Sequence, residues 1–201
     1  CGTEADNWAV KGVAHKMKKD GKKHLITTVI EHHAILHAMH ALEEDGFEVT
    51  YLPADSGGRV RPESVRDALR PDTAMVSVMY ANNELGTIQP VEEIGALCRK
   101  AGVIFHTDAV QAAGTLPIDV VAQNIDMMSV SAHKFHGPKG VGFLYCRRGL
   151  YPDNFMDGGA QERGHRAGTE NVAGIVGMAA ALKEACGSLD EKARHLSSLR
   201  D

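Results

Sequence analysis

The sequence has 201 residues, of which 43% are apolar, and a formal net charge of −4. This length allows one sizeable core in one or two domains, and the mixed charges argue against a basic nucleic-acid surface. No apolar run approaches the roughly 18 residues that span a bilayer, and no signal-peptide pattern is present. The four cysteines are scattered without a CxxC pair, which argues against a disulfide framework or zinc ribbon and favours a reducing cytosol.

Helix-like and strand-like segments alternate along the chain. Apolar residues at helical spacing follow a plausible N-cap at Thr3, and Gly21 ends this first helix. Further helices are predicted over residues 34–44, 62–69, 90–100 and 170–185, with another after Gly187. Strands are predicted over residues 24–28, 47–51, 73–79, 103–107, 126–131 and 141–146. Residues 157–169 form a polar, glycine-rich loop.

This alternation predicts an α/β fold of three layers, in which a mainly parallel sheet carries helices on both faces. In such sheets ligands gather at the carboxyl ends of the strands, so functional residues are expected directly after the strands. The chain starts at Cys1 rather than at Met, and residues 193–201 are helical in pattern without a stop signal. We therefore expect an internal piece of a longer protein.

Four of the predicted strands end in polar residues of distinct types. These are Glu31-His32-His33, Asn82-Asn83-Glu84, Asp108 with Gln111, and Ser131-Ala-His-Lys134. A purely structural sheet does not need an acid, a lysine, amides and a histidine at these places. Pyridoxal phosphate (PLP) chemistry uses all of them.

Each of these residue types has a physical task in that chemistry. A partly desolvated lysine amine binds the cofactor aldehyde as an imine, whereas a free lysine stays protonated up to about pH 10.4. A carboxylate facing the pyridine nitrogen keeps the nitrogen protonated and makes the ring an electron sink. A phosphate needs backbone N–H groups at a helix N-terminus, which Gly2 and Thr3 can offer.

Six motifs resemble those of the cysteine desulfurase family, the NifS- and IscS-like enzymes of the class V aminotransferase fold. They are Gly2-Thr-Glu-Ala-Asp-Asn7, Glu31-His32, Asn82-Asn-Glu-Leu-Gly86, His106-Thr-Asp-Ala-Val-Gln111, Ser131-Ala-His-Lys-Phe-His-Gly-Pro-Lys-Gly140 and Gln161-Glu-Arg-Gly-His-Arg-Ala-Gly-Thr169. The resemblance covers essentially the whole chain and implies a large domain of PLP fold type I at residues 1–188, incomplete at its N-terminus. Residues 189–201 would begin a helix that leads to a missing small domain.

The resemblance also implies roles for the residues around the cofactor ring. Lys134 would carry the cofactor as a Schiff base and later move the substrate proton. His32 would stack on the ring and assist proton transfer. Asp108 would pair with the ring nitrogen, and Gln111 would bond the ring oxygen.

Further residues are implied to hold the phosphate and the substrate. The phosphate ligands would be Gly2, Thr3, Ser131 and His133. Asn83 would lie near the substrate carboxylate. Thr169 would reach the phosphate of the partner subunit, so that a homodimer shares its active sites. No metal is implied.

The implied reaction converts L-cysteine to L-alanine and passes the sulfur on as a persulfide, for iron–sulfur cluster assembly or other sulfur transfer. The partners would be the substrate, a second subunit and a sulfur-acceptor or scaffold protein, with no nucleic acid and no membrane, in the cytoplasm. The family's persulfide cysteine and its small-domain arginine are absent from this chain. Because the segments that carry that cysteine and that arginine are missing, the fragment alone is expected to be inactive. Ala132 and Cys1 also depart from the family pattern.

Simpler interpretations of the same residues remain open. Lys134 could be a solvated surface lysine, Asn83 a turn former, and Asp108, Thr3 and Thr169 helix caps. Cys98, Cys146 and Cys186 are expected to be buried small residues.

Three alternative functions also remain. A selenocysteine lyase fits the motifs nearly as well, and a catalytically incomplete PLP-binding module fits the missing segments. His33, His37 and His40 recur on one helix and could suit zinc, but no acid completes an HExxH pattern, so a partly exposed helix face is favoured.

Overall fold

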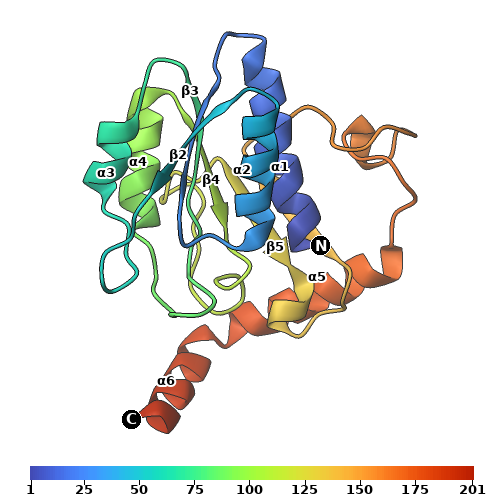
Figure 1. Ribbon diagram of the computed structural model, residues 1–201. Coiled ribbons are helices and arrows are strands. Elements are labelled where there is room, and N and C mark those ends of the chain that lie inside the picture. The colour runs from blue at the N-terminus through green and yellow to red at the C-terminus, as the bar shows by residue number, and fades with distance from the viewer.

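The computed structural model describes residues 1–201 and has one six-stranded sheet at its centre (Figure 1). The strand order is β2-β1-β3-β4-β5-β6. The strands are β1 (His24–Thr28), β2 (Glu48–Leu52), β3 (Thr73–Ser77), β4 (Ile104–Asp108), β5 (Met127–Ser131) and β6 (Gly142–Cys146). All neighbours are parallel except β5 and β6.

Helices cover both faces of this sheet, which confirms the predicted three-layer α/β class (Figure 1). The helices are α1 (Gly2–Lys18), α2 (His33–Glu44), α3 (Pro62–Ala68), α4 (Val91–Ala101), α5 (Val172–Gly187) and α6 (Leu189–Arg200). Two short 3₁₀ turns, η1 (Ala132–Phe135) and η2 (Glu162–Gly164), lie in the connections. Helices α1 and α2 pack on one face, while α3 and α4 pack on the other.

Two apolar clusters hold these layers together. Leu25 and Met75 of the sheet pack with Val10 of α1 beneath the first pair of helices. Phe105 packs with Ile94 of α4 on the opposite face. Because successive residues of a strand point to opposite faces, strands buried on both sides read as continuous apolar runs.

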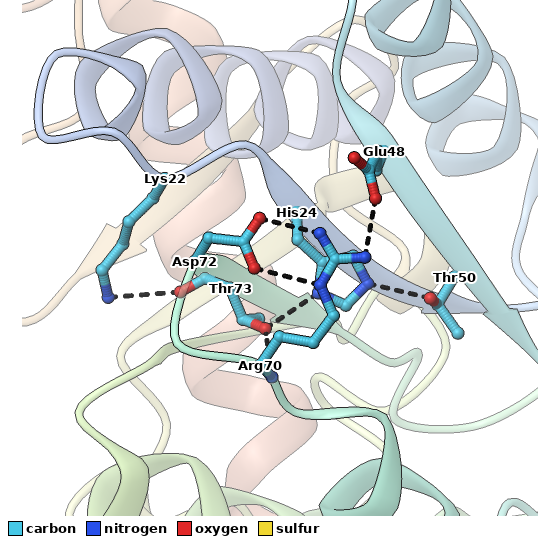
Figure 2. Close-up of polar contacts among 7 residues, drawn as sticks. All are labelled: Lys22, His24, Glu48, Thr50, Arg70, Asp72 and Thr73. Carbon is cyan, nitrogen blue, oxygen red and sulfur yellow. Dashed lines mark hydrogen bonds and ion pairs between the residues drawn. The ribbon is translucent and has the colours of Figure 1, made fainter.

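The amino ends of the strands are closed by a polar cluster, shown in Figure 2. The Arg70 guanidinium donates to both carboxylate oxygens of Asp72, at 3.0 and 2.7 Å, and to Glu48 at 2.6 Å. Behind this pair, the buried His24 ring lies 2.8 Å from the hydroxyls of Thr73 and Thr50. These contacts join the first residues of β1, β2 and β3, so they fix the register of one sheet edge.

Helix α5 runs across the end of the sheet at which α1 begins, and α6 projects away from the sheet (Figure 1). The predicted interruption is present, since α5 ends at Gly187 and α6 is bent by 68° from it. No residue of α6 is buried. No single helix is long and apolar enough to cross a membrane, and α5 with α6 meets that test only as a bent pair, by length and composition.

Candidate active site

A pocket of about 640 Å³ opens at the carboxyl ends of the strands, beside the first turn of α1. It brings together every predicted cofactor-binding residue except Thr169. These are Gly2, Thr3, His32, Asn83, Asp108, Gln111, Ser131, His133 and Lys134. The sequence separates these residues by up to 132 positions, so only the sheet topology can make them neighbours.

Lys134 enters the pocket from η1, the turn that follows β5. His136 ends this turn in the left-handed conformation, with φ of 67°. Gly137 allows the tight return, because a Cβ there would lie 2.9 Å from the Ala132 Cβ and 3.0 Å from its carbonyl oxygen. The lysine amine is therefore presented by a short, sterically defined turn rather than by a free loop.

Asp108 is the last residue of β4, and its side chain is buried on the floor of the pocket. Its Oδ1 accepts a hydrogen bond of 2.9 Å from the Val110 N–H, while its Oδ2 accepts none from the protein. Burial raises the pKa of this carboxyl, and the Val110 N–H, His32 and Lys134 oppose that rise. Asp108 thus closes an Asx-type turn rather than capping a helix, and one carboxylate oxygen stays free for the pocket.

The first turn of α1 forms one wall of the pocket and is built to receive an anion. The helix begins at Gly2 with Cys1 as N-cap, and no side chain caps it, so Thr3 is not the cap that the sequence suggested. A Cβ on Gly2 would lie 2.9 Å from Val110 Cγ2 and 3.2 Å from Ser131 Cβ. The uncapped N–H groups of this turn, together with its positive dipole end, suit a phosphate.

Ser131 and His133 extend this wall. The Ser131 hydroxyl lies 2.9 Å from His133 Nδ1, so the two side chains are oriented by each other. Both line the pocket beside Gly2 and Thr3. Hydroxyl and ring N–H groups add side-chain donors to the backbone donors of α1.

His32 both lines the pocket and caps the N-terminus of α2. Its Nδ1 accepts a hydrogen bond of 3.1 Å from the Ala34 N–H. In the neutral ring the proton must therefore sit on Nε2. This cap fixes the orientation of the ring.

Asn83 lies in a turn at the pocket rim, but Asn82 holds that turn together. The Asn82 Oδ1 accepts from the N–H groups of Glu84 and Leu85, at 2.9 and 2.8 Å. Asn83 lies within this turn but makes no side-chain hydrogen bond that holds it, so its amide remains available to the pocket.

Thr169 lies apart, on the exposed loop before α5. The cap of α5 is Asn171, whose Oδ1 accepts from the Gly174 N–H at 3.0 Å, so the alternative of Thr169 as N-cap is wrong. The loop is tied to α1 by Arg166, which donates to both oxygens of Glu4, at 2.7 and 3.1 Å.

Two buried acids beside the pocket, Glu31 and Asp6, belong to the motifs but were not predicted as site residues. Glu31 accepts at one oxygen from Thr28 Oγ1, at 2.7 Å, and from the Met79 N–H, at 2.8 Å. Its burial raises its pKa to about 8. Asp6 lines the pocket and is only 1% exposed. Its position one turn after Gly2, on the buried stripe of α1, is a signal that could have revealed it.

The structure also shows the surroundings of the cysteines and of the histidines on α2. Cys98 is buried, but Cys186 is exposed, so the expectation of burial is wrong for Cys186. His33 and His37 stack at 5.2 Å, and no group of three or more His, Cys, Asp or Glu side chains is arranged to hold a metal ion.

The pocket therefore combines three chemical capabilities. It can hold an anionic group at the start of α1, a protonated ring nitrogen at the free oxygen of Asp108, and a carbonyl carbon within the range of the Lys134 amine. Lys139, which was not predicted as a site residue, adds a second lysine to the rim.

Comparison with known proteins gives consistent relatives. A profile of the aminotransferase class-V family matches residues 1–200. A cysteine desulfurase IscS of Clostridium botulinum is 56% identical over 199 residues, which are 99% of this chain and 50% of the relative. One of Methanosarcina thermophila is 55% identical over 200 residues, 100% of this chain and 49% of the relative.

A solved structure described as a NifS-like protein has the same fold. Its TM-score is 0.96 at 47% sequence identity, and the match covers 100% of this chain and 55% of the other. The chain thus spans about half the length of the relatives it matches.

Proposed function

The chain belongs to the aminotransferase class-V family, and we propose that it is the cofactor-binding part of a PLP-dependent cysteine desulfurase. Residues 1–188 form the PLP-binding domain, and residues 189–201 lead into a further domain. The supporting observation is that the Lys134 amine and the Asp108 carboxylate line one pocket beneath the N-terminus of α1.

The residues present fit the cofactor. The absence of a side chain at Gly2 lets the start of α1 pack against Val110 and Ser131, where a larger residue would collide, and the uncapped N–H groups of this turn suit an anion. The free Asp108 oxygen suits a ring N–H, and the His32 ring, oriented by its cap, suits a stacking partner. When bound, PLP supplies the electron sink that weakens bonds at the substrate α-carbon.

The side chains of this chain would then divide the work. Lys134 would hold the cofactor through its Nζ, and once the substrate amine had taken its place the freed Nζ would move the substrate proton. Asp108 would keep a negative charge at the ring nitrogen, and Gln111 would donate to the ring oxygen. Asn83 orients the substrate carboxylate from the rim.

The substrate is L-cysteine, which leaves as L-alanine while the sulfur passes to an acceptor or scaffold protein as a persulfide. The thiols of the buried Cys98 and the half-buried Cys146 are unsuited to carry that sulfur, because burial raises the pKa of Cys98 to about 12 and of Cys146 to about 11. The sulfur would serve iron–sulfur cluster assembly or other sulfur transfer, and the protein would act in the cytoplasm. The four free cysteines agree with a reducing location.

Thr169 has a role only if a second subunit is present. It is exposed and outside the pocket of its own chain, as a residue that serves a neighbouring site would be. We therefore include a homodimer with shared active sites in the proposal.

The test uses the full-length protein and its Lys134→Ala variant. The wild type should show a visible absorbance band with PLP and release alanine from cysteine, and Lys134→Ala should lose both. Lys139→Ala is the matched control, because it removes an amine from the same pocket and should keep the band. A band that survives Lys134→Ala contradicts the assignment. Comparing cysteine with selenocysteine turnover separates a desulfurase from a selenocysteine lyase.

A further inference from the structure

A layer of buried polar side chains lies directly beneath the pocket, on the α1 face of the sheet. Ser77 of β3, His106 of β4 and Ser129 of β5 are completely buried. The His106 ring joins them, since its Nδ1 lies 2.9 Å from the Ser77 hydroxyl and its Nε2 lies 2.9 Å from the Ser129 hydroxyl. Asp6 of α1 lies over this layer, with its Oδ1 3.9 Å from His106 Nε2.

Asp6 has no cation to balance a negative charge. Its Oδ1 is buried without any hydrogen-bond partner. The nearby His106 ring is neutral, because burial lowers its pKa to about 3. Burial, and next the charge of Asp108, raise the pKa of Asp6 well above its usual value, with a smaller opposing effect from Ser129. An ionised, unpaired carboxylate at this place would be costly.

Asp108 lies two residues after His106 on the same face of β4 but has a different environment. It accepts the Val110 N–H, and the charges of His32 and Lys134 favour its ionised form. Ionising two neighbouring buried carboxyl groups is unfavourable because their negative charges repel each other. Asp108, which has the donor and the positive charges nearby, therefore loses its proton before Asp6 does.

We propose that Asp6 is a positioning residue that remains a neutral acid, so that Asp108 carries the negative charge of the pocket floor. The Ser77–His106–Ser129 chain supports Asp6 from below. The inference rests on the proposed function, because the charge on Asp108 is the one that would face the cofactor's ring nitrogen. An ionised Asp6 would drive the proton onto Asp108 and remove that charge.

The first test observes the proton directly. Full-length apoprotein labelled with carbon-13 at the aspartate carboxyls is followed by NMR from pH 5 to 9, and Asp6 is assigned through its own backbone. The titratable groups facing Asp6 are Asp108 and His106 from β4 and Glu31 from the turn after β1. The Asp6 carbon should keep its protonated shift at pH 7. An ionised shift at pH 7 overturns the proposal.

The second test separates charge from shape by measuring the PLP dissociation constant. Asp6→Ala should weaken PLP binding at least tenfold, and Asp6→Asn, which keeps a neutral polar group of the same shape, should restore it to within threefold of wild type. Asp108→Asn should stay at least tenfold weakened. If Asp6→Asn is as weak as Asp108→Asn, Asp6 acts as a carboxylate and the inference is wrong. A wild type that binds no PLP refutes the proposed function instead and leaves the NMR result standing.

Discussion

The buried acid Glu31 should make the protein less stable as the pH rises, and Glu31→Gln should remove this dependence. The side chain is 5% exposed, and its pKa rises from 4.5 to about 8, first because of burial. Between these two values the folded state binds a proton that the unfolded chain releases, so stability falls as pH increases. At pH 7, which lies 2.5 units above the unfolded-state pKa of 4.5, this titration lowers the free energy of unfolding by about 3.4 kcal/mol relative to its value at low pH.

The geometry of the site explains why glutamine is the right replacement. One oxygen of Glu31 accepts from Thr28 and Met79, and a glutamine oxygen can accept both bonds. The other oxygen is buried without a partner, as the glutamine amide would be. Glutamine therefore keeps the hydrogen bonds of the protonated acid but cannot ionise.

Urea unfolding of the full-length apoprotein at constant ionic strength measures the effect. The free-energy difference between Glu31→Gln and wild type should change by about 2.5 kcal/mol in favour of the variant between pH 5.5 and 7.5. Subtracting the wild-type free energy of unfolding from that of the variant cancels the contributions of all groups that titrate identically in both proteins. The exposed Glu44→Gln is the control for loss of one carboxylate. A Glu31→Gln difference that stays constant across this range would refute the reasoning.

Three further changes probe the site and its frame. Gly2→Ala should weaken PLP binding about tenfold and cost about 1–3 kcal/mol of stability in urea unfolding, because its methyl meets Val110 at 2.9 Å. Arg166→Gln should speed amide hydrogen exchange in residues 157–169. It should lower the free energy of unfolding by no more than about 1 kcal/mol, since the Arg166–Glu4 ion pair is partly exposed. Unchanged exchange would show that this ion pair does not hold the loop on α1. His106 has a folded-state pKa of about 3, below its ordinary 6.5, so the stability it contributes is lost as pH falls from 6.5 towards 3. Acid unfolding of His106→Asn should therefore be flatter over that interval, and an equally steep curve would contradict the depressed pKa.

The sequence located most of the sheet because its strands are short apolar runs between turn residues. The segment 24–28 was predicted with the bounds that β1 has, and 103–107 lies one residue from β4. The helix predicted over residues 90–100 corresponds to α4, which is capped by Gly102, whose φ of 66° is the left-handed conformation that glycine tolerates. The antiparallel pairing of β6 was not predicted, although the ten residues between β5 and β6 are too few for a helical crossover.

The candidate site was predictable only in part. Side chains directly after strands could be recognised, since parallel strands bring their carboxyl ends together. Asp6 and Glu31 were not predicted as site residues because their burial arises from tertiary packing. For Asp6, the place on the apolar stripe of α1 was the one available signal. The cap formed by His32 was missed for another reason, since histidine is a rare N-cap.

The Arg70 cluster at the amino ends of β1 to β3 is a stabilising network at the opposite end of the sheet from the pocket. Strands of five residues place it about 16 Å from the pocket, beyond the range at which substitutions usually couple. Changes around Arg70 can therefore adjust the heat tolerance of the protein without altering its chemistry. Substitutions intended to raise stability are therefore best placed there, at the end of the sheet opposite the pocket.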